Sequence, residues 1–136
     1  MSEEPSFLEA KEVLALYEDI SIATGMNAGP INQRMLESAV YRPRQIYSYS
    51  EATSIPELGA CIAYSITKFH PFFDGNKRTS FAAMDLFLVQ NNWENFADQF
   101  AIAHMIEKMA ANNIDERAFT QWVTSHCRII EEDLWE

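Results

Sequence analysis

The stretch His70-Pro-Phe-Phe-Asp-Gly-Asn-Lys-Arg78 decides how this chain of 136 residues folds. The segment before it, residues 54–69, carries apolar residues at helical spacing, and Pro71 cannot continue that helix. The segment after it reads TSFAAMDLFLVQ (79–90) and is apolar on nearly every side, which is typical of a helix at the centre of a molecule. The nine residues are therefore predicted to form a loop between two helices.

Apolar periodicity predicts four more helices around this pair. They are expected over residues 6–23, from Asn32 to the residue before Pro43, and over 99–111 and 116–127. Gly25 suits a left-handed cap after the first helix, and Asn32 suits an N-cap for the second. Before the motif, Ser54 and Glu57 form a capping-box pattern.

Residues 44–53 (RQIYSYSEAT) lack a helical period. Ile46, Tyr47 and Tyr49 favour strands and alternate with serines such as Ser48, so we predict an extended flap or short hairpin here. The expected fold is all-α, with about six helices and this short flap. One domain spans residues 1–136, with its core at about 6–127 and an acidic tail at 128–136.

Composition narrows the class of protein. Apolar residues make up 48% and charged residues 22%, which is a globular profile. The net charge of −10 repels phosphate backbones, so direct nucleic-acid binding is not expected. No segment is long and apolar enough for a membrane span or a signal peptide, so we expect a cytoplasmic protein. Cys61 and Cys127 are interpreted as buried free thiols.

The motif combines groups that suit a nucleotide triphosphate. His70 is a candidate general base, because an unperturbed imidazole has a pKa of about 6.5. Asp74 offers a hard carboxylate oxygen for Mg²⁺ held mainly by phosphates and water. Phe72 is expected to be buried beneath the loop.

The remaining motif residues suit an anion. Gly75 permits close backbone approach, and Asn76, Lys77 and Arg78 open the next helix, whose first N–H groups favour anions. Lys77 adds a point charge and Arg78 a planar fork for phosphate oxygens. Cations at a helix start are unfavourable against the helix dipole, which we interpret as a sign of a bound anion. Together these residues predict phosphoryl or nucleotidyl transfer.

The string HPFFDGNKR resembles the signature of the Fic/Doc superfamily, and specifically its Doc (death-on-curing) toxin branch. Two further segments, LESAVYRP (36–43) and FLVQNNW (87–93), look like Doc-branch sequence, so the resemblance covers about residues 9–123. It implies that His70 activates a target hydroxyl, that Asp74 holds Mg²⁺, and that Asn76, Lys77 and Arg78 bind the phosphates of ATP. It also implies that the 44–53 flap aligns the target by strand-like pairing.

Within this resemblance, Lys77 favours the Doc-type branch over the Fic-type branch. Enzymes of the Fic type that transfer AMP usually have Gly there, whereas Doc-type toxins have Lys and transfer a phosphoryl group to a target such as a translation elongation factor. Two positions depart from the patterns: Phe81 replaces the second Arg of Fic enzymes, and Ala82 replaces an Asn of phage-type Doc. The chain also lacks the self-inhibitory motif of longer Fic proteins, which fits restraint by a separate antitoxin protein.

Other classes of function stay open from the sequence. AMP transfer is the nearest alternative, and an inactive interaction module with this fold is the second. A metal-dependent nuclease fits poorly, because such sites need a β-hairpin before the motif and a metal ligand from the helix after it.

Overall fold

Within residues 4–26 and 28–131, which the computed structural model describes, the chain forms six α-helices and one two-stranded antiparallel sheet. The elements are α1 (Ala10–Thr24), α2 (Gln33–Tyr49), α3 (Ile55–Phe69), α4 (Asn76–Gln90), β1 (Trp93–Asn95), α5 (Gln99–Ala110), α6 (Glu116–Ser125) and β2 (Cys127–Ile129). The predicted all-α class with about six helices is confirmed.

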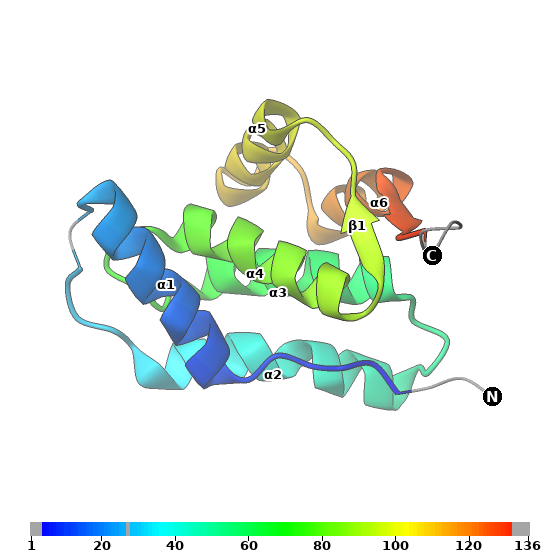
Figure 1. Ribbon diagram of the computed structural model, residues 1–136, viewed down its shortest axis with the longest axis horizontal. Coiled ribbons are helices and arrows are strands. Elements are labelled where there is room, and N and C mark those ends of the chain that lie inside the picture. Colours follow the sequence, from blue (N-terminus) through cyan, green and yellow to red (C-terminus); the bar gives the residue numbers. More distant parts are fainter. Residues whose placement is uncertain (1–3, 27, 132–136) are drawn as a thin grey trace.

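The helices are arranged around the α3–α4 pair (Figure 1). In this view α2 lies below the pair, α5 and α6 lie above it, and α1 crosses in front of it. The α3 helix packs against α2, α4, α5 and α6, and ten of its fifteen residues are buried. The motif 70–78 joins α3 to α4, so its position is fixed by the most buried part of the fold.

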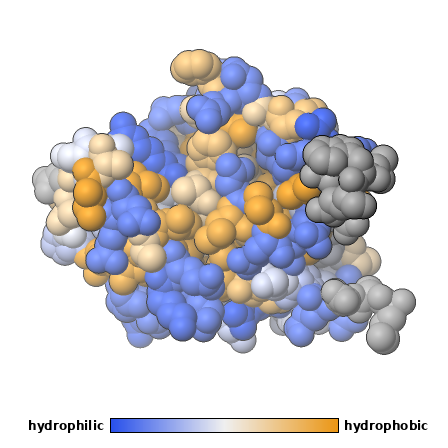
Figure 2. Space-filling view, in the orientation of Figure 1, coloured by the Kyte–Doolittle hydropathy of each residue, from blue (hydrophilic) through white to orange (hydrophobic). Residues whose placement is uncertain are grey.

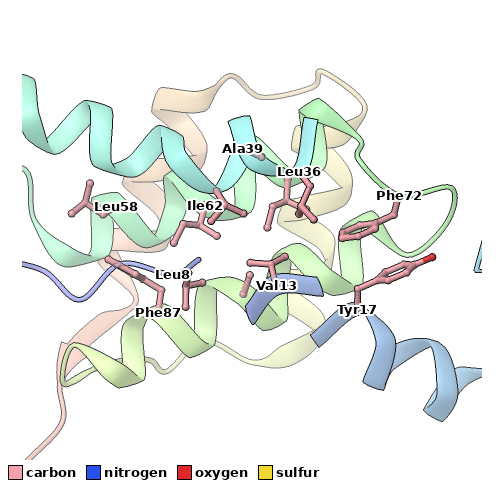
Figure 3. Packing of buried hydrophobic residues seen from close by; sticks show 12 residues of the cluster. Leu8, Val13, Tyr17, Leu36, Ala39, Leu58, Ile62, Phe72 and Phe87 are labelled. Carbon is pink, nitrogen blue, oxygen red and sulfur yellow. The ribbon is translucent and has the colours of Figure 1, made fainter. Parts of the chain in front are cut away.

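Each side of the α3–α4 layer has its own hydrophobic cluster. The first cluster joins α1 and α2 to this layer, and Figure 3 shows Val13, Leu36, Ile62 and Phe87 pointing into it. The second cluster joins the layer to α5 and α6, and it includes Met84, Leu88, Ile106 and Phe119. Burial on both faces explains why α4 is apolar nearly all round.

Three predicted helix caps are confirmed, although α1 begins at Ala10 and not at residue 6. Gly25 caps α1 in the left-handed region (φ 65°), and Asn32 accepts a hydrogen bond from the Met35 N–H at the start of α2. The capping box of α3 is complete, because Glu57 N–H donates to Ser54 Oγ and Ser54 N–H donates to the Glu57 carboxylate.

The predicted extended flap at 44–53 is wrong, because α2 continues through Pro43 to Tyr49. Proline costs a helix one hydrogen bond, but tertiary packing offsets that loss here. Ile46 and Tyr47 pack against the first cluster, and Tyr47 meets Phe7 edge-on with ring centroids 5.9 Å apart. Only residues 50–54 between α2 and α3 are non-helical.

The C-terminal part differs from the prediction in a smaller way. The sheet pairs Trp93 with Ile129 and Asn95 with Cys127, so residues 128 and 129 belong to a strand and not to an acidic tail. Glu131 is exposed, and the rest of the predicted tail, 132–136, lies outside the described residues. Short strands of three residues give too little period to detect in sequence.

An ion pair ties α2 to α6 beside α3. Both terminal nitrogens of Arg42 donate to the Glu116 carboxylate, and one of them also donates to Ser65. Cys61 is buried next to this pair, and burial raises the pKa of its thiol to about 11. The prediction of a buried free thiol is confirmed for Cys61, whereas Cys127 is only partly buried.

The surface in the orientation of Figure 1 is mostly hydrophilic (Figure 2). Apolar side chains gather in a band across the middle of this face, over α4. No helix in the described part of the chain is both long and apolar enough to cross a membrane.

The Ser54 cap gives a test of this architecture. Ser54→Ala removes the acceptor for the first turn of α3 and should lower the free energy of unfolding by about 1 kcal/mol. Ser48→Ala makes the same change within α2, where alanine is a good helix former, and should change stability by less than about 0.5 kcal/mol. Urea denaturation measures both. Equal losses in the two variants would contradict the capping role.

Candidate active site

Two left-handed residues turn the chain between α3 and α4. His70 ends α3 with φ 51° and Gly75 precedes α4 with φ 86°. A histidine in this region is uncommon, and the next residue, Pro71, prevents any continuation of α3. The Asn32 N–H holds the loop from outside by donating to the Pro71 carbonyl at 2.8 Å.

The Asn76 side chain closes the loop from inside. Its Oδ1 accepts from the Phe72 N–H at 3.0 Å, and its Nδ2 donates to the Phe72 carbonyl at 2.8 Å. The same Nδ2 lies 3.2 Å from His70 Nδ1. Asn76 is only 5% exposed, and both hydrogens of its amide are directed at these two partners. The predicted contact of Asn76 with phosphate would therefore come from its backbone N–H in the first turn of α4.

These hydrogen bonds also determine which nitrogen of the neutral His70 imidazole carries the hydrogen. The Phe72 backbone fixes the Asn76 amide orientation, so Nδ2 can only donate to His70 Nδ1. The neutral ring then carries its hydrogen on Nε2, and the lone pair of Nδ1, which accepts from Asn76, is the one that can take up a proton. Because His70 is exposed, a target hydroxyl can approach the ring.

Phe72 and Gly75 are supported from beneath by α1 and the residues after it. The prediction that Phe72 is buried is confirmed, since it is 1% exposed and stacks on Tyr17 with centroids 3.9 Å apart (Figure 3). A Cβ at Gly75 would clash with the Met26 side chain, and the positive φ also favours glycine.

A pocket of about 450 Å³ opens between the start of α4 and α5. Four predicted motif residues line it: Asp74, Gly75, Lys77 and Arg78. Its other lining residues are Phe81 from α4 and Ala103, Ile106 and Glu107 from α5. Of the predicted phosphate-binding residues, Gly75, Lys77 and Arg78 line this pocket with Asp74, whereas Asn76 does not, and His70 lies at the other end of the same loop.

Glu107 contributes a contact that the sequence did not indicate. Its carboxylate forms an ion pair with Lys77, and both side chains are about half exposed. This pair neutralises the cation at the start of α4, so the unfavourable position of Lys77 does not by itself require a bound anion. Arg78 has no hydrogen bond or ion pair with any described residue and is the cation available for a phosphate.

Asp74 fits a role as a magnesium ligand shared with phosphates. One of its oxygens accepts from the Gly75 N–H at 2.7 Å, and the side chain is exposed at the pocket. No three His, Cys, Asp or Glu side chains gather into a metal site among the described residues. A single carboxylate matches an ion that keeps its other positions for phosphate oxygens and water.

The flap residues lie elsewhere than predicted. Ile46 and Tyr47 pack on the core, and their backbone belongs to a helix, so they cannot pair with a target as a strand. Ser48 donates to the Gln45 carbonyl within the same helix. Tyr49 is 93% exposed at the end of α2. The spacing of Leu36, Val40, Pro43 and Tyr47 is helical and was the signal for this continuation.

The chain matches the Fic/DOC family over residues 7–88, which include the whole motif, all of α3 and most of α4. The chain belongs to the Fic/DOC family. Fic/DOC proteins are transferases, and the geometry of the motif loop agrees with that class. No curated protein matches the sequence.

The Asn76 clamp predicts a stability change. Asn76→Ala leaves the buried Phe72 N–H and carbonyl without their partners, which should cost about 1–3 kcal/mol in the free energy of unfolding. Asn113→Ala is a matched control, because Asn113 is exposed and its side chain bonds no described residue. Urea denaturation of both variants is the measurement. A loss in Asn76→Ala no larger than in the control would refute the clamp.

The Lys77–Glu107 pair predicts a gain in anion binding. Glu107→Gln removes the carboxylate that holds Lys77 and should raise the affinity for inorganic tripolyphosphate about two- to fivefold, since exposed pairs contribute up to about 1 kcal/mol. Glu18→Gln on α1 changes the net charge equally, outside the pocket lining, and should have little effect. Isothermal titration calorimetry at fixed salt compares them. The same gain in both variants would indicate a general charge effect instead.

Proposed function

We propose that this Fic/DOC protein is a Doc-type toxin that transfers a phosphoryl group from ATP to a Ser or Thr hydroxyl of a target protein. The observation that carries the proposal is the position of Lys77 in the pocket beside Arg78 and Asp74. A lysine side chain fills space that AMP-transferring relatives leave open with glycine. It supplies a second cation for the phosphate chain when the substrate displaces Glu107.

Each motif residue has its own role in the proposed reaction. The target hydroxyl gives its proton to His70 Nδ1 while its oxygen attacks the γ-phosphorus. The bond from that phosphorus to the bridging oxygen breaks, and ADP leaves with the electron pair. Arg78, Lys77 and the first N–H groups of α4 bind the phosphate oxygens. Asp74 would hold Mg²⁺, which supplies positive charge against the developing negative charge.

Proton uptake at Nδ1 has a structural cost. The hydroxyl must replace the Asn76 contact at this nitrogen, which is the longest of the three made by the Asn76 amide. Leaving this buried Asn76 N–H without a partner costs about 1–3 kcal/mol, which is small compared with a catalytic barrier. Asn76 therefore holds the ring in place before the target binds and releases Nδ1 to it.

Further parts of the proposal rest on the resemblance to Doc. A translation elongation factor is the proposed target class, and its modification would block protein synthesis in the cytoplasm. A separate antitoxin protein would restrain the activity in the same cell. Because the predicted flap is helical, target docking is not assigned to residues 46–49.

Labelled ATP tests the transfer. ATP labelled at either the α or the γ phosphate is incubated with the protein, magnesium and a purified elongation factor, and label on the factor is counted. Label from the γ position alone is expected, and His70→Asn should reduce it at least about a hundredfold. Asparagine suits this position because it tolerates the left-handed backbone that His70 adopts.

The remaining outcomes separate the alternatives. Label from the α position on the factor would mean AMP transfer and would overturn the phosphoryl proposal. Growth arrest is followed in cells that express the parent or the His70→Asn variant. Arrest of equal strength with both would mean that the protein acts by binding and not by catalysis.

A further inference from the structure

The pocket at the start of α4 has a charged end and an apolar end. Asp74, Lys77, Arg78 and Glu107 form the charged end. The apolar end consists of three side chains with no polar atoms: Phe81, Ala103 and Ile106. Ile106 is 2% exposed and belongs to the second hydrophobic cluster, so it is a fixed floor. Phe81 is partly exposed, which leaves some of its ring facing the pocket.

The charged end and the apolar end of the pocket lie one after the other along α4 and α5. Lys77 and Glu107 form one contact between α4 and α5. Phe81 lies one turn after Lys77 in α4, and Ala103 lies one turn before Glu107 in α5. Both residues line the pocket. Four residues of helix rise about 6 Å, so the apolar end is that much further from the motif loop.

We propose that the apolar end binds the base of the phosphate donor, with the base stacked on Phe81, and this inference rests on the proposed transferase function. A nucleotide has one charged and one flat apolar part, and the pocket offers matching surfaces in the same order. The small side chain of Ala103 leaves room opposite the ring.

This arrangement orients the donor. With the base at Phe81, the phosphates extend past Lys77 and Arg78 toward the start of α4 and the loop that carries His70. The terminal phosphate is then the one nearest the imidazole. Glu107 at the charged end would repel phosphate, but its carboxylate could accept a hydrogen bond from a ribose hydroxyl.

Separate titrations of ATP and inorganic tripolyphosphate test the base site. Stacking of a base on an aromatic side chain is lost in Phe81→Ala and Phe81→Leu, so ATP affinity should fall about tenfold or more. Tripolyphosphate affinity should not change, because it has no base. Phe81→Trp should retain ATP binding. Phe81→Leu keeps an apolar side chain in α4, so the test does not depend on whether the alanine variant folds.

Phe100→Ala is the matched control, because Phe100 is 84% exposed and lies outside the pocket. It should bind ATP like the parent. Unchanged ATP affinity in Phe81→Leu, or an equal loss for ATP and tripolyphosphate, would overturn the base site.

Failure of the base site and failure of the proposed function give different results. A selective loss of ATP affinity in Phe81→Leu, with no γ-label on any target, would leave the base site standing and the proposed function refuted. Transfer of γ-label by the parent protein, together with unchanged ATP affinity in Phe81→Leu, would support the proposed function and refute the base site.

Discussion

The amide of Asn76 closes the loop between α3 and α4, and the rest of the site depends on it. It binds both polar atoms of the Phe72 backbone and also meets His70 Nδ1, so one buried side chain fixes the loop and the imidazole together. Its partners lie in a region where Phe72 stacks on Tyr17. Buried polar groups that are fully paired favour a single conformation of the loop and of the imidazole.

The charged groups around this loop are arranged on one side of α4. Glu107 holds Lys77 across the pocket, while Arg78 has no partner in the described part of the chain. The two cations are therefore not equivalent: a phosphate can bind Arg78 directly but must compete with a carboxylate for Lys77. That difference arises from α5, a helix that lies beyond the matched family region of residues 7–88.

Local signals and long-range packing account for different parts of the fold. Helix caps such as Ser54 and Gly25 were predictable, because a cap depends on residues within one turn. The continuation of α2 past Pro43 was not predicted, because its stability comes from the packing of Ile46 and Tyr47 against distant residues. The small sheet was missed for a similar reason, since its strands pair residues more than 30 positions apart.

The motif 70–78 is where sequence alone was most informative. It determined the loop between two central helices and the family, because these depend on residue types at fixed local spacing. Only the tertiary structure decided that the Asn76 side chain serves the loop and not a ligand, and that Lys77 is paired with Glu107. It also placed Phe81 in the pocket. The Lys77–Glu107 pair and the position of Phe81 in the pocket depend on how α5 packs across α4, and no local pattern records that contact.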